Sequence, residues 1–178
     1  MAMTKIVFSG YGGQGVLVLG EIVATIAMKK GKHVTWMPSY GPEMRGGTAN
    51  CAVIISDTLI GSPIVLSDID ILVAMNHASV DKFVPKMHKN GLVMYNSTIV
   101  TTPPVSENLN ILPIDATAIA GEVGNNRVAN MVMLAGFLRK TDLFQLEDIQ
   151  DVLEVRFAGA RSKELIPLNM KAIEAGLK

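Results

Sequence analysis

A glycine-rich segment near the start of the chain has the composition of an anion-binding loop. It reads Gly10-Tyr11-Gly12-Gly13-Gln14-Gly15. The spacing G-x-G-x-x-G permits a tight turn, a close approach of a ligand to the backbone, and close packing of a helix on a strand. A helix that begins after such a loop offers unpaired N–H groups and partial positive charge to a phosphate or another anion. The same glycines also fit a purely structural turn. The candidate cofactor-binding residues here are Gly10, Gly12, Gly13, Gln14 and Gly15.

A second segment, Ser39-Tyr40-Gly41-Pro42-Glu43-Met44-Arg45-Gly46-Gly47-Thr48, is the other candidate for ligand contact. Its glycines permit positive φ and close backbone approach. Its tyrosine offers an aromatic platform, and Glu43 and Arg45 offer opposite charges. The alternative is a structural turn in which these two charges are solvated or paired. The candidate binding residues of this segment are Tyr40, Gly41, Glu43, Arg45, Gly46, Gly47 and Thr48.

A dinucleotide site needs more than the first glycine segment. A domain that binds NAD places a carboxylate for the ribose about twenty residues further on, and one that binds NADP places an arginine nearby. The corresponding stretch reads Val34-Thr35-Trp36-Met37-Pro38-Ser39 and holds neither. We therefore disfavour a nicotinamide cofactor, and a phosphate or cofactor tail remains the functional alternative.

The elements that would position these segments follow from the hydrophobic pattern. Residues 5–9 form a short apolar run typical of a buried strand, and residues 16–30 predict a helix with one narrow polar stripe. Residues 33–37 predict a second strand, closed by Pro38. Each glycine segment thus follows a strand. In a parallel sheet both would lie at the carboxyl edge, where α/β proteins bind ligands.

The rest of the chain continues the alternation of strands and helices. Further strands are predicted at residues 49–56, 63–66, 69–75, 92–95 and 110–114, with a turn at Asn90-Gly91. Further helices are predicted at residues 78–87, 116–122, 127–140 and 146–157, and a last one ends near Ala175 with Pro167 in its first turn. This alternation predicts an α/β fold with a mostly parallel sheet and an antiparallel excursion near residues 46–66.

Composition excludes several classes of function. The formal net charge of zero gives no indication of a basic face that would bind nucleic acid or anionic lipid. The single Cys51 excludes a disulfide framework and a cysteine-ligated iron–sulfur cluster within this chain. The three histidines are scattered, so no metal site is predicted, and no catalytic residue stands out. No apolar stretch is long enough to span a bilayer, and we expect one cytoplasmic domain over residues 1–178.

The chain is unusually poor in charge. Charged residues make up 18% of its 178 residues, and the mean hydropathy is +0.34; about 25% charged is usual for a globular chain. Residues 16–28 and 128–138 are apolar almost all round a helix, with Asn130 embedded in the second as a satisfied core or interface amide. This pattern predicts apolar surface that something else covers.

The two glycine segments together resemble the gamma subunit of 2-oxoacid:ferredoxin oxidoreductases. The second segment looks more like the 2-oxoglutarate or branched-chain 2-oxoacid enzymes than the pyruvate enzymes. Supporting matches are Ile60-Gly61-Ser62-Pro63, Asp68-Ile69-Asp70, and Arg127-Val128-Ala129-Asn130-Met131 with Gly136-Phe137. They extend the resemblance over nearly the whole chain.

The resemblance implies a Rossmann-like three-layer sandwich within a multi-subunit enzyme. Such an enzyme oxidatively decarboxylates a 2-oxoacid onto coenzyme A and passes the electrons to ferredoxin. The resemblance places thiamine diphosphate, magnesium and the iron–sulfur clusters in the alpha, beta and delta partner subunits, and leaves coenzyme A as the ligand for the glycine segments. The isolated chain would then form a homodimer through its apolar surface. Two alternatives stay open: a purely structural assembly subunit and a free-standing nucleotide-binding dehydrogenase.

Overall fold

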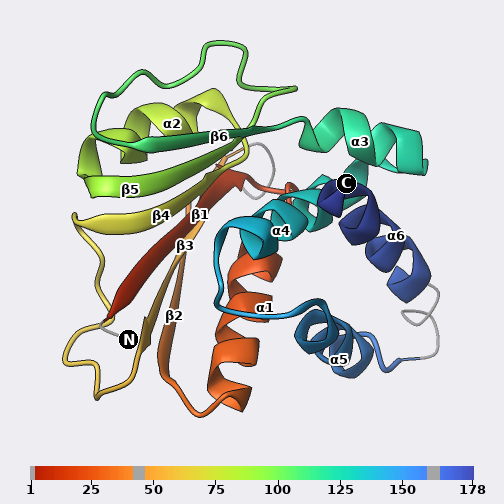
Figure 1. The fold of residues 1–178 in the computed structure, drawn as a ribbon, viewed down its shortest axis with the longest axis horizontal. Helices are drawn as coiled ribbons and strands as arrows, with labels where there is room; N and C mark the ends of the chain where they lie inside the picture. Colours follow the sequence, from red (N-terminus) through yellow and green to blue (C-terminus); the bar gives the residue numbers. More distant parts are fainter. Residues whose placement is uncertain (1–2, 42–46, 160–164) are drawn as a thin grey trace.

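The computed structural model describes residues 3–41, 47–159 and 165–178 as one mixed sheet with helices on both faces (Figure 1). The strands are β1 (Thr4–Tyr11), β2 (His33–Tyr40), β3 (Thr48–Ser56), β4 (Ile69–Ala74), β5 (Met87–Asn96) and β6 (Asn110–Ile114). The α-helices are α1 (Val16–Lys29), α2 (His77–Phe83), α3 (Ala116–Val123), α4 (Ala129–Lys140), α5 (Leu146–Arg156) and α6 (Leu165–Leu177). Two short 3₁₀ turns, Val84–Lys86 and Asn126–Val128, complete the described elements.

The sheet has the order β2-β3-β1-β4-β5-β6, and its parallel part is β1-β4-β5-β6. Strand β3 runs antiparallel to both of its neighbours, β1 and β2. The expected α/β fold is therefore confirmed, and the antiparallel excursion is β3. Two antiparallel pairings in succession leave β2 and β1 pointing the same way, so their carboxyl ends share one edge of the sheet.

Two cores hold the layers together. On one face Ile6 and Phe8 of β1 pack with the buried sides of α1 and α4, including Leu19 and Phe137. On the other face the smaller core around Val7, Leu72 and Phe83 lies under α2. Figure 1 shows the asymmetry: α1 and α3–α6 lie on one side of the sheet, and α2 lies on the other.

Some local predictions were wrong. Residues 63–66 form no strand and lie in the connection between β3 and β4, where Ile64 and Leu66 are exposed and so lack the burial that the apolar run had indicated. Strand β2 continues through Pro38 to Tyr40, because an edge strand tolerates a residue that lacks an N–H. Asn90, with φ of 67°, lies inside β5 at an irregularity of the pairing with β4 rather than in a separate turn.

The helix predictions hold, with small shifts at the ends. Helix α2 stops at Phe83 and passes into a 3₁₀ turn that contains Pro85. Helix α4 begins after a second 3₁₀ turn, and Asn125 caps that turn by accepting a hydrogen bond from the backbone N–H of Arg127. Helix α5 is tied to α1 by two ion pairs, Lys30–Asp148 and Arg156–Glu21. The Lys30 ammonium lowers the pKa of the Asp148 carboxyl below its ordinary value.

Candidate functional site

The two glycine segments meet at the carboxyl edge of β1 and β2. Tyr11 at the end of β1 pairs with Thr48, and Tyr40 at the end of β2 pairs with Ala49. The backbone N–H of Gly12 donates to the carbonyl of Gly47 over 2.9 Å. This bond joins the first segment directly to the second, so the predicted common edge is confirmed.

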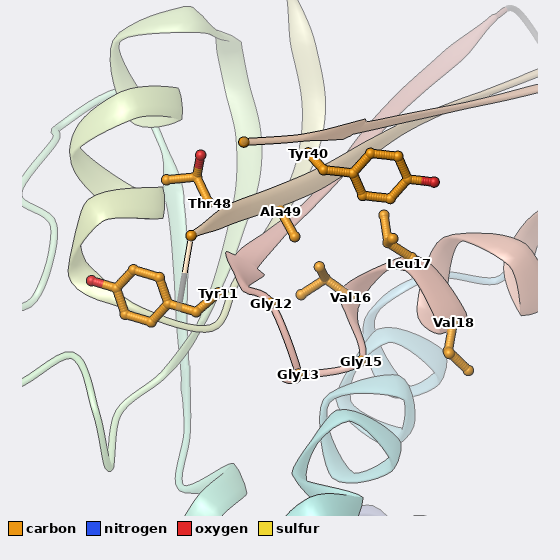
Figure 2. Close-up of a pocket in the computed structure, with 12 residues that line it drawn as sticks. Tyr11, Gly12, Gly13, Gly15, Val16, Leu17, Val18, Tyr40, Thr48 and Ala49 are labelled. Atoms are coloured by element: carbon orange, nitrogen blue, oxygen red, sulfur yellow. The ribbon is translucent and has the colours of Figure 1, made fainter. Parts of the chain in front are cut away.

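A cavity of about 560 Å³ opens between these strand ends and the first turn of α1 (Figure 2). In Figure 2 Tyr40 and Ala49 come from the strands, and Val16, Leu17 and Val18 come from the helix. The lining also holds glycine backbone, and its polar side-chain groups are two phenols and one threonine hydroxyl. The full lining is Tyr11, Gly12, Gly13, Gly15, Val16, Leu17, Val18, Tyr40, Gly41, Gly47, Thr48 and Ala49.

Among the described residues no side chain caps the N-terminus of α1. Its N-cap residue, Gly15, has left-handed backbone with φ of 72°. Along α1 the first backbone N–H that donates a hydrogen bond is that of Leu19, which donates to the carbonyl of Gly15 over 3.1 Å. Within the described part of the chain the N–H groups of Val16, Leu17 and Val18 donate no hydrogen bond. Helix α1 therefore directs three unpaired donors and partial positive charge toward this edge of the sheet.

No acidic residue lies in the first turn of α1 or along the described lining of the cavity. The arrangement favours a ligand that carries an anionic group together with apolar or flat parts. The anionic group would accept hydrogen bonds from the helix, and the apolar part would contact the aliphatic and aromatic side chains.

The structure brings together most of the predicted binding residues. Gly12, Gly13, Gly15, Tyr40, Gly41, Gly47 and Thr48 line the cavity. Gly10 and Gln14 lie beside it without lining it, and Gly10 is buried. Glu43, Arg45 and Gly46 lie outside the described residues. Whether any of them contacts a ligand stays a prediction.

Sequence reasoning missed five lining residues: Tyr11, Val16, Leu17, Val18 and Ala49. Three of them belong to the first helical turn after the glycines. The signal was present in the sequence, because the turn that offers free N–H groups necessarily presents its side chains near the ligand. Their apolar character had indicated core packing instead.

Cys51 is a buried structural residue of β3. Its S–H donates to the carbonyl of Val16 over 3.5 Å, and its side chain lies against the helix at Gly20, where an added Cβ would be 2.3 Å from the sulfur. Burial raises the pKa of the thiol to about 12, although a hydrogen bond donated by the Trp36 side chain to the sulfur opposes this shift. Because nucleophilic attack requires a thiolate, Cys51 is an inert thiol.

We expect Cys51 in the folded chain to resist alkylation at pH 8, since the thiol is inaccessible and protonated. Iodoacetamide labelling followed by mass spectrometry measures this directly. The same chain in urea, where labelling should be complete, is the control. Labelling of the native chain at the denatured rate would show that Cys51 is accessible.

His77, the first residue of α2, makes a structural contact. The Nε2 atom of His77 accepts a hydrogen bond from the backbone N–H of Thr101 over 3.2 Å and so fixes the start of a loop. Among the described residues no three histidine, cysteine, aspartate or glutamate side chains are grouped to hold a metal ion. Within that same part of the chain no helix has the length and apolarity required to cross a bilayer.

Comparison with known proteins assigns the chain to a family. The family described as pyruvate ferredoxin/flavodoxin oxidoreductase matches residues 5–178. The chain belongs to this family. Subunit VorA of the ketoisovalerate oxidoreductase from Methanothermobacter marburgensis is 38% identical over 172 residues, which are 97% of this chain. The chain spans only 35% of the length of that relative.

Solved structures of the family share the fold. The gamma subunit of a keto/oxoacid ferredoxin oxidoreductase from Geobacter sulfurreducens superposes with a TM-score of 0.81 at 31% identity, covering 98% of this chain and 96% of that one. The 2-oxoglutarate:ferredoxin oxidoreductase from Magnetococcus marinus superposes with a TM-score of 0.88 at 21% identity. That match covers 99% of this chain and 30% of the longer one. The gamma-subunit resemblance is therefore confirmed, and the same family unit is a separate chain in the Geobacter protein and part of a longer chain in VorA.

Proposed function

We propose that this chain is the gamma subunit of a multi-subunit 2-oxoacid:ferredoxin oxidoreductase and forms part of its coenzyme A site. The enzyme would decarboxylate a 2-oxoacid, transfer the acyl group to coenzyme A and pass the electrons to ferredoxin. The substrate would be 2-oxoglutarate or a branched-chain 2-oxoacid. The observation that carries the role of this chain is the uncapped N-terminus of α1 at the edge of a largely apolar cavity.

Coenzyme A matches the chemistry of this cavity. Its phosphates would accept hydrogen bonds from the free N–H groups of Val16, Leu17 and Val18. Its pantetheine arm and adenine ring would contact apolar and aromatic surface such as Leu17 and Tyr40. Arg45, outside the described residues, would add a charge-assisted contact to a phosphate. The structural relative from Magnetococcus marinus was solved with 2-oxoglutarate, coenzyme A and succinyl-CoA bound.

The oxidation itself would take place on partner subunits. Alpha, beta and delta subunits would hold thiamine diphosphate, magnesium and the iron–sulfur clusters, and ferredoxin would bind to the assembly. The described residues of this chain include no metal-binding group, and Cys51 is a buried, protonated thiol. The chain would complete the coenzyme side and hold the complex together in the cytoplasm.

The proposal is tested by co-expressing a tagged version of this chain with neighbouring reading frames and purifying the complex. The purified complex should reduce ferredoxin only when both coenzyme A and a 2-oxoacid are present. A purely structural subunit would leave the dependence on coenzyme A unchanged when residues of the cavity are substituted. Tight binding of NAD(H) or NADP(H) to the isolated chain would instead support a dehydrogenase.

We expect the isolated chain to form a homodimer. Large apolar side chains are exposed on several elements, among them Met28 at 62%, Val155 at 70% and Leu66 at 76% exposure. Association would cover part of this surface in the absence of the partner subunits. Sedimentation velocity at micromolar concentration measures the mass. A monodisperse monomer would contradict this expectation.

A further inference from the structure

We propose that Gln14 is a positioning residue of the coenzyme site, which acts through the shape of the glycine segment and not by touching the ligand. The idea rests on the proposed function only in naming coenzyme A as the ligand. The amide of Gln14, supported by Asn76 at the N-cap of α2, holds the loop that leads into the first turn of α1.

The side chain of Gln14 folds back over its own loop. Its Oε1 atom accepts a hydrogen bond of 2.6 Å from the backbone N–H of Tyr11. Its Nε2 atom donates over 3.3 Å to the carbonyl of Met75, the residue that directly follows β4. The backbone N–H of Gln14 also donates to the carbonyl of Tyr11 over 3.0 Å. One residue thus closes the turn and attaches it to the neighbouring strand.

Asn76 extends this network to α2. Its Nδ2 atom donates to Oε1 of Gln14 over 3.2 Å. Its Oδ1 atom accepts from the backbone N–H of Ser79 over 2.9 Å and from the Ser79 hydroxyl over 2.8 Å, so it caps the start of α2. Asn76 is buried, with 2% of its surface exposed. The orientation of the Gln14 amide is therefore set by a rigid element outside the loop.

The side chain of Gln14 points away from the ligand cavity. A Cβ atom added at Gly10 would lie 2.7 Å from Oε1 of Gln14, so Gly10 leaves room for this amide. The amide faces β4, whereas the cavity opens between α1 and the ends of β2 and β3, and Gln14 does not line it.

On the opposite side of the loop Asn130 of α4 donates to the carbonyl of Gly15 over 3.4 Å. The glycine segment is thus held from the β4 side by Gln14 and from the α4 side by Asn130. Loss of the Gln14 amide would leave the Tyr11 N–H without its partner and release the loop from β4.

The test measures steady-state kinetics of the assembled complex. Gln14→Ala should raise the KM for coenzyme A about tenfold, while kcat at saturating coenzyme A and the KM for the 2-oxoacid stay within about twofold. A residue needed only for stability would not raise this KM selectively. A ligand-contact residue would raise it too, but its effect would not depend on Asn76, which does not line the cavity.

Asn76→Asp keeps the oxygen that caps α2 but removes the N–H that bonds to Gln14. It should raise the KM for coenzyme A about threefold. The double variant Gln14→Ala/Asn76→Asp should be no worse than Gln14→Ala alone, because both changes act through one amide. Ser97→Ala is the matched control: it removes a hydrogen bond of 2.6 Å to Asp115 beyond β5, away from the glycine segment, and should change neither KM.

An unchanged KM for coenzyme A in Gln14→Ala, or fully additive effects in the double variant, would overturn the proposal. If Gln14→Ala fails to assemble, Asn76→Asp decides alone, since it preserves the cap of α2. A separate variant tests the proposed function. If coenzyme A does not bind at this cavity, Leu17→Glu, which changes the cavity itself, also leaves the KM for coenzyme A unchanged.

Discussion

Leu17→Glu is expected to raise the KM of the assembled enzyme for coenzyme A by at least about tenfold. Leu17 lies in the uncapped first turn of α1 and lines the cavity, so the new carboxylate would occupy the place of the ligand's anionic group. Two like charges about 4 Å apart repel by about 1 kcal/mol in bulk water and by about 4 kcal/mol near a protein surface. A change of ~1.4 kcal/mol corresponds to a factor of ten in affinity. Steady-state assays with varied coenzyme A measure the change.

The substitution should leave the fold intact. A glutamate in the first turn interacts favourably with the helix dipole by about 0.3–1 kcal/mol, and Leu17 is only half-buried. Thr25→Glu is the control, since it adds the same charge to α1 about two turns beyond the cavity, at a half-buried side chain like Leu17. Equal effects of the two variants would indicate a general charge effect and would argue against a site at the helix N-terminus.

Gly15→Ala is expected to destabilise the chain by about 2–5 kcal/mol. Left-handed backbone costs a residue with a Cβ about 1–2 kcal/mol, and Gly15 has φ of 72°. The added Cβ would also lie 2.3 Å from Nδ2 of Asn130, and such overpacking costs typically 1–3 kcal/mol more. Urea unfolding followed by circular dichroism measures the difference from the midpoint at constant slope.

Gly13→Ala isolates the backbone term. Gly13 has φ of 99° with no heavy atom within 4 Å of an added Cβ, so we expect a loss of only about 1–2 kcal/mol. The double variant Gly15→Ala/Asn130→Ala removes the collision and should recover part of the stability that Gly15→Ala loses. If Gly13→Ala and Gly15→Ala destabilise equally, contact with Asn130 does not constrain this loop.

Local pattern predicted most elements of this fold. The run at residues 110–114 was bounded correctly as β6, and the narrow polar stripe of α1, with Glu21 and Lys29 on it, was found where expected. The insertion of β3 between β2 and β1 could not be predicted, because sheet order depends on pairings between residues far apart in the chain. The open edge of β2 also explains how the strand passes through Pro38, which the sequence had indicated as its end.

The location of the site was predicted better than the side chains that line it. Because parallel strands end at the same edge of a sheet, the two glycine segments were expected to lie together, and they do although β1 and β2 are not neighbours. Which side chains face the cavity depends on side-chain direction, which was not predicted. Gln14 faces β4 and Leu17 faces the cavity, and nothing in the spacing of the glycines distinguishes these two orientations. The embedded Asn130 proved to be a satisfied amide, since it bonds to Gly15 and accepts from the N–H of Met131.

The low charge of the chain is partly explained within the fold. Residues 129–137 of α4 are all buried, because the helix lies between the sheet, α1, α3 and α6. Helix α1 is likewise buried along most of its length. The remaining apolar surface, including Leu59 at 83% exposure, is left for partner subunits or for a second copy of the chain.

Binding of coenzyme A to this chain at the first turn of α1 can be tested by photo-crosslinking. The assembled complex is irradiated with an azido-adenine analogue of coenzyme A, and the labelled peptides are mapped by mass spectrometry. We expect labels in residues 11–18 or 40–49, suppressed by excess coenzyme A and by Leu17→Glu. Labels confined to the partner subunits, with none on this chain, would show that coenzyme A binds elsewhere.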